Sequence, residues 1–230
     1  MTPRAAMILA AGFGTRMGAL TQDRPKPLIH VGERTLIDHA IAAAGSCDPI
    51  VVNGHYRAEM LRNHLATHHP HTRFSWEQPN ILDSGGAIKH ALPLLGADPI
   101  LTLNADNVWA GPLPHAVLNQ HWDRTMMDAL MLLVPPDHAV GRKGGGDVAL
   151  SPDGCLSWNR ADNGLVYTGA QILTTGLIAG WHTRVFSLRD VWQKMMDAGR
   201  VYGCLYPGFW ADVGHPDGIS LAEAMPKHAV

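Results

Sequence analysis

Charge imbalance and long apolar runs are both missing from this 230-residue sequence, and their absence excludes whole classes of protein. The 18 lysine and arginine residues nearly balance the 20 acidic residues, which leaves a formal net charge of −2. No global basic field therefore attracts nucleic acid or an anionic membrane surface. No apolar run approaches the length of a membrane span, and no signal-type segment precedes the first expected strand. We expect a protein of the cytoplasm that binds neither nucleic acid nor membrane.

Cysteine is also scarce, with Cys47, Cys155 and Cys204 as the only three. Their wide separation gives no metal-type pairing and favours free thiols in a reducing compartment. Histidine is more abundant, and four histidines cluster between residues 64 and 71. Because adjacent histidines and an intervening proline do not give helical metal spacing, we expect this cluster to be a solvated loop at a helix end.

Apolar runs typical of strands alternate with helical patterns over the first 134 residues, which predicts right-handed βαβ units. The fold class is therefore α/β, with a Rossmann-like, mainly parallel sheet flanked by helices. The expected strands are 5–9, 50–53, 73–76, 99–103 and 129–134, and the expected helices are 35–44, 57–66, 84–94 and 115–122.

From residue 144 the pattern changes to short strands separated by Pro-Asp-Gly and Asp-Asn-Gly turns. We expect strands 147–150, 155–158 and 166–173 to form a small β-rich excursion over the active-site face. A helix at 188–198, a strand at 201–205 and a helix at 216–224 complete the expected order. Since no linker or repeat interrupts the chain, one domain over 1–230 is predicted.

Residues 9–17 read Leu-Ala-Ala-Gly-Phe-Gly-Thr-Arg-Met, and Pro-Lys-Pro-Leu follows at 25–28. Gly12 and Gly14 allow backbone N–H groups to approach phosphate oxygens. Arg16 adds a planar cation and Lys26 a mobile one. A buried strand, a glycine-rich turn and two cations favour a site for a nucleoside triphosphate. The dinucleotide fingerprint fits poorly, because Met17 stands where a third glycine is needed.

Two aspartates at the ends of short apolar strands add acidic groups to the predicted site. Asp106 follows the strand ending at Leu103, and Asp212 lies in Trp-Ala-Asp-Val-Gly at 210–214. Ligands bind at the carboxyl ends of strands in open parallel sheets, and Mg²⁺ prefers a few carboxylates together with substrate oxygens. A shared Mg²⁺ on these two carboxylates is therefore predicted.

The glycine-rich string, the Pro-Lys-Pro-Leu segment and the two aspartate motifs together resemble the signature of the sugar-1-phosphate nucleotidyltransferases. The resemblance spans residues 5–224, with Ala105 in place of the family's usual glycine before Asp106. It implies that the Asp-Ser-Gly-Gly segment at 83–86 fits around the nucleobase with free N–H groups, and that Tyr-Thr-Gly-Ala-Gln at 167–171 lies against the sugar.

The resemblance thus implies four sets of site residues. The catalytic residues would be Arg16, Lys26 and Asp106, and the Mg²⁺ ligands would be Asp106 and Asp212. The nucleotide would contact Leu9, Ala10, Ala11, Gly12, Gly14, Thr15, Asp83, Gly85 and Gly86. The sugar-1-phosphate would contact Asn53, Asn104, Gly169 and Gln171.

The short single-domain form favours UTP as the nucleoside triphosphate and an N-acetylated hexosamine-1-phosphate, in particular N-acetylmuramate-1-phosphate, as acceptor. The lactyl carboxylate of that acceptor calls for a cation, and the candidates are Arg142, Lys143 and Arg160. Transfer from GTP to mannose-1-phosphate remains an alternative. A regulatory protein that binds a nucleotide-sugar without catalysis is an alternative of another class.

Overall fold

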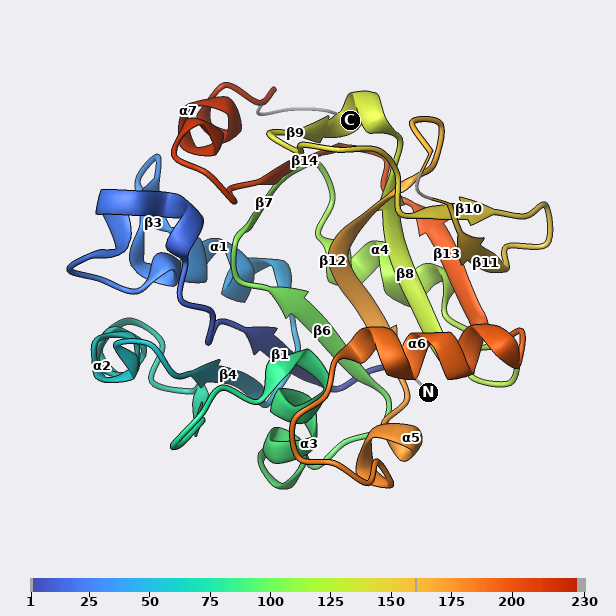
Figure 1. Cartoon of the computed structure of the whole chain (residues 1–230), viewed down its shortest axis with the longest axis horizontal. Coiled ribbons are helices and arrows are strands. Elements are labelled where there is room, and N and C mark those ends of the chain that lie inside the picture. The colour runs from blue at the N-terminus through green and yellow to red at the C-terminus, as the bar shows by residue number, and fades with distance from the viewer. Residues whose placement is uncertain (1, 160, 227–230) are drawn as a thin grey trace.

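A seven-stranded sheet forms the centre of the molecule (Figure 1). The computed structural model describes residues 2–159 and 161–226. The strand order is β13-β8-β12-β6-β1-β4-β5, and all neighbouring strands are parallel except where β12 is involved. The strands are β1 (Ala5–Leu9), β4 (Ile50–Gly54), β5 (Arg73–Trp76), β6 (Ile100–Asn104), β8 (Ala129–Val134), β12 (Val166–Leu173) and β13 (Val201–Leu205).

Strand β12 corrects the sequence-based expectation for the β-rich excursion. The segment Val166–Leu173 does form a strand, but it lies inside the central sheet, antiparallel to both β6 and β8. Nearly all of its side chains are buried, on both faces of the sheet. A strand in an excursion over the surface would expose one of its faces to solvent. The excursion is smaller than expected and consists of the hairpin β10 (Val148–Leu150) and β11 (Leu156–Trp158).

Helices cover both faces of the sheet, as the alternating pattern predicts. In β8, alternate side chains belong to two different core clusters, because successive side chains of a strand point to opposite faces. One cluster includes residues of α1 (Leu36–Ala43), α2 (Ala58–His68) and α4 (Pro114–His121). The other includes residues of α3 (Asp83–Leu95), α5 (Gly176–Ala179) and α6 (Leu188–Asp197). Burial on both faces explains why the central strands read as continuous apolar runs.

A second, three-stranded sheet was not anticipated from the sequence. It has the order β7-β14-β9 and packs against the last helix, α7 (Asp217–Glu223). Its strands are β7 (Asn107–Ala110), β9 (Ala139–Val140) and β14 (Phe209–Asp212). These strands are only two to four residues long and far apart in sequence, so their pairing becomes visible only in the folded chain. This sheet joins the C-terminal segment to the end of β6.

The remaining elements lie mainly in the N-terminal loops. The short hairpin β2 (His30–Val31) and β3 (Arg34–Thr35) leads into α1. The described residues form three 3₁₀ helices: η1 (Thr15–Thr21), η2 (Lys26–Leu28) and η3 (Pro136–His138). Among the described residues, no helix is long and apolar enough to cross a membrane.

Candidate active site

The glycine-rich loop and the Asp106 segment meet because β1 and β6 are adjacent parallel strands. Leu9 pairs with Asn104 in the sheet register, and the N–H of Ala105 donates to the carbonyl of Leu9 over 3.1 Å. Both segments therefore leave the same edge of the sheet side by side. The two segments thus meet at the carboxyl ends of the strands, where ligands bind in open parallel sheets.

The loop folds back on Lys26 through Gly14. Gly14 has a φ of 66°, and a Cβ added there would lie 2.9 Å from the Cβ of Lys26. Glycine therefore meets two requirements at this position, a left-handed backbone and close contact with the lysine stem. The hydroxyl of Thr21 donates to the carbonyl of Gly14 over 3.1 Å and closes the loop.

A cavity of about 210 Å³ lies between this loop and the Asp106 segment. It is bordered by residues of the predicted nucleotide contact set, by both predicted cations and by the end of β6. The lining residues are Leu9, Ala10, Gly12, Gly14, Thr15, Arg16, Lys26, Pro27, Ala105, Asp106 and Gly214. We call it the loop cavity. Ala11, which was also predicted to contact the nucleotide, is buried.

Within the loop cavity, Lys26 and Asp106 form an ion pair. Their Nζ and Oδ2 atoms are 2.7 Å apart, and the lysine side chain is only 11% exposed. A buried lysine requires a partner for its charge, and Asp106 supplies it. The two residues, 80 positions apart in sequence, therefore belong to one charged group at the site.

Asp212 reaches the same place through the three-stranded sheet. It pairs with Asn107 in the β14–β7 register, and the N–H of Val213 donates to the carbonyl of Asp106 over 3.0 Å. Burial raises the pKa of the Asp212 carboxyl, and the negative charge of Asp106 raises it further. Lys26 and Arg16 oppose this rise. A buried carboxyl whose ionisation is disfavoured by a neighbouring carboxylate forms, together with that neighbour, a site suited to a divalent cation.

A second cavity, of about 250 Å³, adjoins the loop cavity and shares Arg16 and Asp106 with it. Three tryptophans and two further arginines contribute to its wall, so we call it the tryptophan cavity. Its lining residues are Arg16, Asn104, Asp106, Asn107, Met131, Arg142, Asp147, Val148, Trp158, Tyr167, Gly169, Arg189, Trp192, Trp210 and Asp212. The β10–β11 hairpin thus does border the site, as the expected excursion implied.

The arginines of the tryptophan cavity are held in different ways. Arg142 forms an ion pair with Asp147 at 2.8 Å, and its buried Nε atom has no hydrogen-bond partner among the described residues. Arg189 lies over the ring of Trp158, 4.7 Å from its centroid. The Nε1 atom of Trp210 is likewise buried without a partner in the described part of the chain. Such unsatisfied donors favour a ligand rich in acceptor oxygens.

Gly169 shapes the wall of this cavity beside Asn104. It has a φ of 78°, and a Cβ added there would lie 2.6 Å from the Nδ2 atom of Asn104 and 2.5 Å from that of Asn107. A glycine is therefore required at position 169, because the side chains of two asparagines lie close to its Cα. Both Gly169 and Asn104, which were predicted to contact the sugar, line the cavity.

The other two predicted sugar contacts are placed away from both cavities. Asn53 is 3% exposed; it accepts a hydrogen bond from the N–H of Ala10 over 2.6 Å and donates to Glu77 over 2.5 Å. Gln171 is fully buried and accepts a hydrogen bond from Trp192 over 3.0 Å. Both side chains form hydrogen bonds with residues of the cavity walls, Asn53 with Ala10 and Gln171 with Trp192, and their direct contact with the sugar stays a prediction.

The Asp-Ser-Gly-Gly segment begins α3, as expected, but its N–H groups are not free. Gly85 and Gly86 both donate to the carbonyl of Phe186, at 3.0 and 3.1 Å. A Cβ on Gly86 would lie 2.3 Å from the carbonyl oxygen of Arg184. The two glycines therefore allow the segment before α6 to pack against α3. Asp83 is exposed, and its contact with the nucleotide stays a prediction.

Among the candidate cations for an acceptor carboxylate, Lys143 is exposed and Arg160 lies outside the described residues. Arg189 was missed. It sits near the start of α6, where the sequence shows only a polar helix position. Trp158 and Trp192 also line the cavity. These side chains line the same cavity only because α6 packs against β13 and α3.

The sequence matches a protein-family model and is similar to two known relatives. Residues 6–152 match the family described as the MobA-like NTP transferase domain. The chain is 39% identical to N-acetylmuramate alpha-1-phosphate uridylyltransferase of Caulobacter vibrioides, covering 99% of this chain and 98% of that protein. It is 37% identical to a mannose-1-phosphate guanyltransferase of Hypocrea jecorina, over 91% of this chain but only 60% of that protein.

A solved structure shares the fold. The crystal structure of HddC from Yersinia pseudotuberculosis in complex with GMP-PN superposes with a TM-score of 0.78 at 21% identity, covering 96% of this chain and 98% of HddC. At that identity the likeness concerns the fold, a mostly parallel sheet flanked by helices.

Proposed function

The chain belongs to the nucleotidyltransferase family of the MobA-like NTP transferase domain, and on that premise we propose that it transfers a uridylyl group from UTP to N-acetylmuramate-1-phosphate. The products would be the nucleotide-sugar and pyrophosphate. The proposed substrates rest on the match to the Caulobacter uridylyltransferase, which covers nearly the whole of both chains. The two adjoining cavities, with a shared wall of one arginine and one aspartate, support a reaction between two anionic substrates.

In the proposed reaction, an oxygen of the sugar phosphate attacks the α-phosphorus of UTP. A new P–O bond forms there while the bond from the α-phosphorus to the bridging oxygen breaks, and pyrophosphate leaves with that electron pair. The nucleophile is already anionic, so no side chain has to accept a proton. The protein contributes positioning and neutralisation of charge.

The loop cavity suits the triphosphate. Backbone N–H groups of the glycine-rich loop and Arg16 would hold the β- and γ-phosphates, and Lys26 would contact the α-phosphate or the incoming sugar phosphate. Lys26 is anchored on Asp106 in this structure, which directs its ammonium group to the boundary between the two cavities.

Mg²⁺ fits the pair of carboxylates on chemical grounds. Asp106 and Asp212 are oxygen donors, their segments are joined by a backbone hydrogen bond, and the pKa of Asp212 is raised by burial and by Asp106. A divalent cation would relieve that repulsion. Bound there, Mg²⁺ would supply neutralisation of the charge on the reacting phosphates.

The tryptophan cavity suits the sugar phosphate. Arg142 and Arg189 offer cations for the lactyl carboxylate, and the buried donors of Arg142 and Trp210 offer hydrogen bonds to oxygen acceptors. Of the cations proposed from the sequence that lie in the described part of the chain, Arg142 lines this cavity and Lys143 does not, and Arg189 joins Arg142.

The guanylyltransferase alternative receives weaker support. The match to the Caulobacter uridylyltransferase is 39% identical over 98% of that protein, whereas the match to the Hypocrea guanyltransferase is 37% identical over 60% of that protein. A non-catalytic regulatory role is disfavoured because Arg16, Lys26, Asp106 and Asp212 are all present and gathered around one pair of cavities.

The decisive experiment is a matrix of donors and acceptors, with pyrophosphate release as readout. We expect UTP with N-acetylmuramate-1-phosphate to give the highest kcat/KM, ahead of the GTP and mannose-1-phosphate combinations. A preference for GTP with mannose-1-phosphate would establish the guanylyltransferase alternative instead. Binding of a nucleotide-sugar without turnover in any combination would point to the regulatory role.

A further inference from the structure

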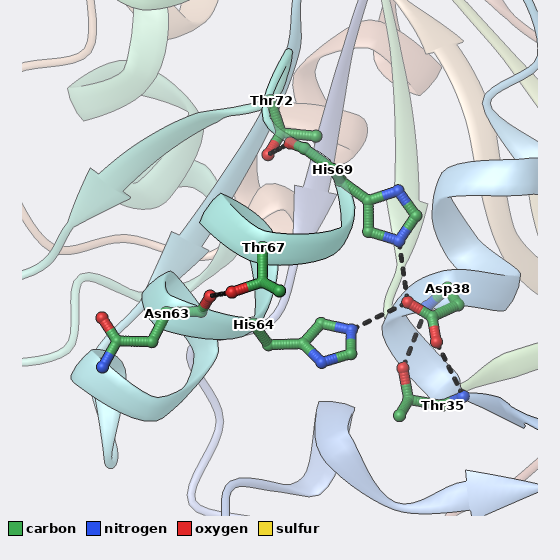
Figure 2. A network of polar contacts seen from close by, with 7 residues as sticks. All are labelled: Thr35, Asp38, Asn63, His64, Thr67, His69 and Thr72. Carbon is green, nitrogen blue, oxygen red and sulfur yellow. Dashed lines mark hydrogen bonds and ion pairs between the residues drawn. The ribbon is translucent and has the colours of Figure 1, made fainter.

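The histidine cluster at residues 64–71 is not the solvated loop expected from the sequence. Helix α2 extends to His68, so His64 and His68 lie one helical turn apart with ring centroids separated by 4.6 Å. His64 and His69 both turn toward Asp38 of α1 (Figure 2). Their side chains are only 17% and 25% exposed. The three residues connect two helices that are separate in the sequence.

The contacts converge on a single carboxylate oxygen. Oδ1 of Asp38 lies 2.9 Å from Nε2 of His64 and 2.8 Å from Nε2 of His69. These three atoms all lie within 4.8 Å of one another. In a tetrahedral Zn²⁺ site, bonds of about 2.0–2.1 Å place ligand atoms about 3.3 Å apart, so each Oδ1–Nε2 distance would lengthen by roughly half an ångström to accommodate the ion.

The carboxylate of Asp38 is already oriented for this role. Its Oδ2 atom accepts the backbone N–H of Thr35 over 3.0 Å as part of the capping box that begins α1 (Figure 2). Its other oxygen, Oδ1, is directed to the imidazoles of His64 and His69. An outer hydrogen bond of this kind fixes the orientation of a metal ligand.

The cluster also faces open space. A cavity of about 1100 Å³ is lined by all three residues and by Asp23, Arg24 and Met60, among others. A metal ion held by three protein atoms would thus keep its fourth position accessible to water or to a small anion.

We propose that Asp38, His64 and His69 form a binding site for a divalent transition-metal ion of the Zn²⁺ class, separate from the predicted Mg²⁺ site. Two imidazoles and one carboxylate match the ligands that Zn²⁺ prefers, whereas Mg²⁺ prefers an all-oxygen shell. The ion would connect α1 to the end of α2. It would also lie beside Asp23 and Arg24, which precede Lys26 in the chain.

Calorimetric titration of the full chain with Zn²⁺, in buffer containing excess Mg²⁺, tests the proposal. We expect one saturable Zn²⁺ site in the parent protein. His64→Gln and His69→Gln should each raise the dissociation constant about a hundredfold or more. His71→Gln is the matched control, because His71 is an exposed histidine outside the group, and should bind Zn²⁺ as the parent does.

A spectroscopic readout separates the site from unspecific binding to surface histidines. Co²⁺ bound to the parent should give the visible absorption of a tetrahedral site, which should be lost in His69→Gln and retained in His71→Gln. Circular dichroism of each variant checks that it is folded. Turnover with Mg²⁺ alone should be unchanged in His64→Gln, so the test does not depend on the proposed reaction.

Three outcomes would overturn the proposal. The parent could show no saturable Zn²⁺ site, which would leave Asp38, His64 and His69 as a hydrogen-bond network only. Folded His64→Gln and His69→Gln could bind Zn²⁺ like the parent. Alternatively, His71→Gln could weaken binding as much as they do, which would place the ion elsewhere.

Discussion

The two adjoining cavities are built from the sequence in different ways. The loop cavity is lined mainly by one continuous stretch, residues 9–27, whereas the tryptophan cavity takes its wall from segments scattered between residues 104 and 212. Arg16 and Asp106 belong to both. The difference explains why the residues of the loop cavity can be recognised as a motif in the sequence. The second cavity exists only after distant strands and helices have packed.

The two predicted Mg²⁺ ligands, Asp106 of both cavities and Asp212 of the tryptophan cavity, should be the residues most sensitive to substitution. Asp106→Asn and Asp212→Asn should each lower kcat by at least about a thousandfold, because both remove a predicted Mg²⁺ ligand between the two substrates. Pyrophosphate release measures the effect, and chelation of Mg²⁺ should abolish turnover of the parent. Asp137→Asn, at an exposed carboxylate, is the control. Near-normal turnover in either variant would remove that residue from the metal site.

Substitution of Arg16, the cation of the glycine-rich loop, should weaken the binding of the triphosphate and slow its reaction. Arg16→Ala should raise the KM for UTP and lower kcat by about a hundredfold, because it removes a donor that stabilises the departing pyrophosphate. Lys26→Ala should lower kcat at least as much and also leaves Asp106 without its partner. Steady-state kinetics with UTP varied measures both. Unchanged kinetics of Arg16→Ala, matched to the exposed control Arg34→Ala, would contradict the assignment.

A substitution confined to the tryptophan cavity should change the KM for the acceptor and leave the KM for UTP unchanged. Arg189→Gln should raise the KM for N-acetylmuramate-1-phosphate about 10- to 100-fold, the range expected when one charge-assisted hydrogen bond is lost, with the KM for UTP unchanged. Lys194→Gln is a close control, because Lys194 lies on the same helix over Trp181 at 4.4 Å and is not among the cavity residues. An equal rise in both KM values would show that the cavities are not separate subsites.

The packing behind the site can be tested without substrates. Gly86→Ala should destabilise the fold by about 1–3 kcal/mol, because the added Cβ meets the backbone carbonyl of Arg184. Thermal unfolding measures the loss. Gly176→Ala is the control, since a Cβ at that helical glycine meets nothing within 4 Å. If Gly86→Ala keeps its stability and loses only UTP binding, the glycine contacts the nucleotide after all.

The smallest expected effect concerns pH. Because burial and Asp106 raise the pKa of Asp212, its carboxyl gains a proton at a higher pH than an ordinary aspartate does. The Mg²⁺ concentration needed for half-maximal activity should therefore increase as pH falls toward that raised pKa. Measurement of Mg²⁺ dependence across acidic pH tests this. A requirement that does not change with pH would argue against Asp212 as a ligand.

Local patterns were sufficient for the strands of the central sheet and for most of the helices. The predicted strands 5–9, 73–76, 129–134 and 201–205 coincide with β1, β5, β8 and β13, and the predicted helices end within one or two residues of the observed ones. These elements are buried on one or two faces, so burial sets the spacing of their apolar residues. The strand 166–173 was found but misplaced, because a buried antiparallel strand has the same apolar pattern wherever it is inserted.

The sequence by itself determined the family, the alternation of strands and helices and the charged residues of the glycine-rich loop, because each depends on neighbouring residues. Tertiary structure decided which distant groups meet. Pairing of β14 with β7 carries Asp212 to Asp106, and the packing of α6 brings Arg189 over Trp158. The docking of α2 and its following loop on α1 likewise turns two histidines toward Asp38. Such contacts depend on strand order and helix packing, which no short window of sequence encodes.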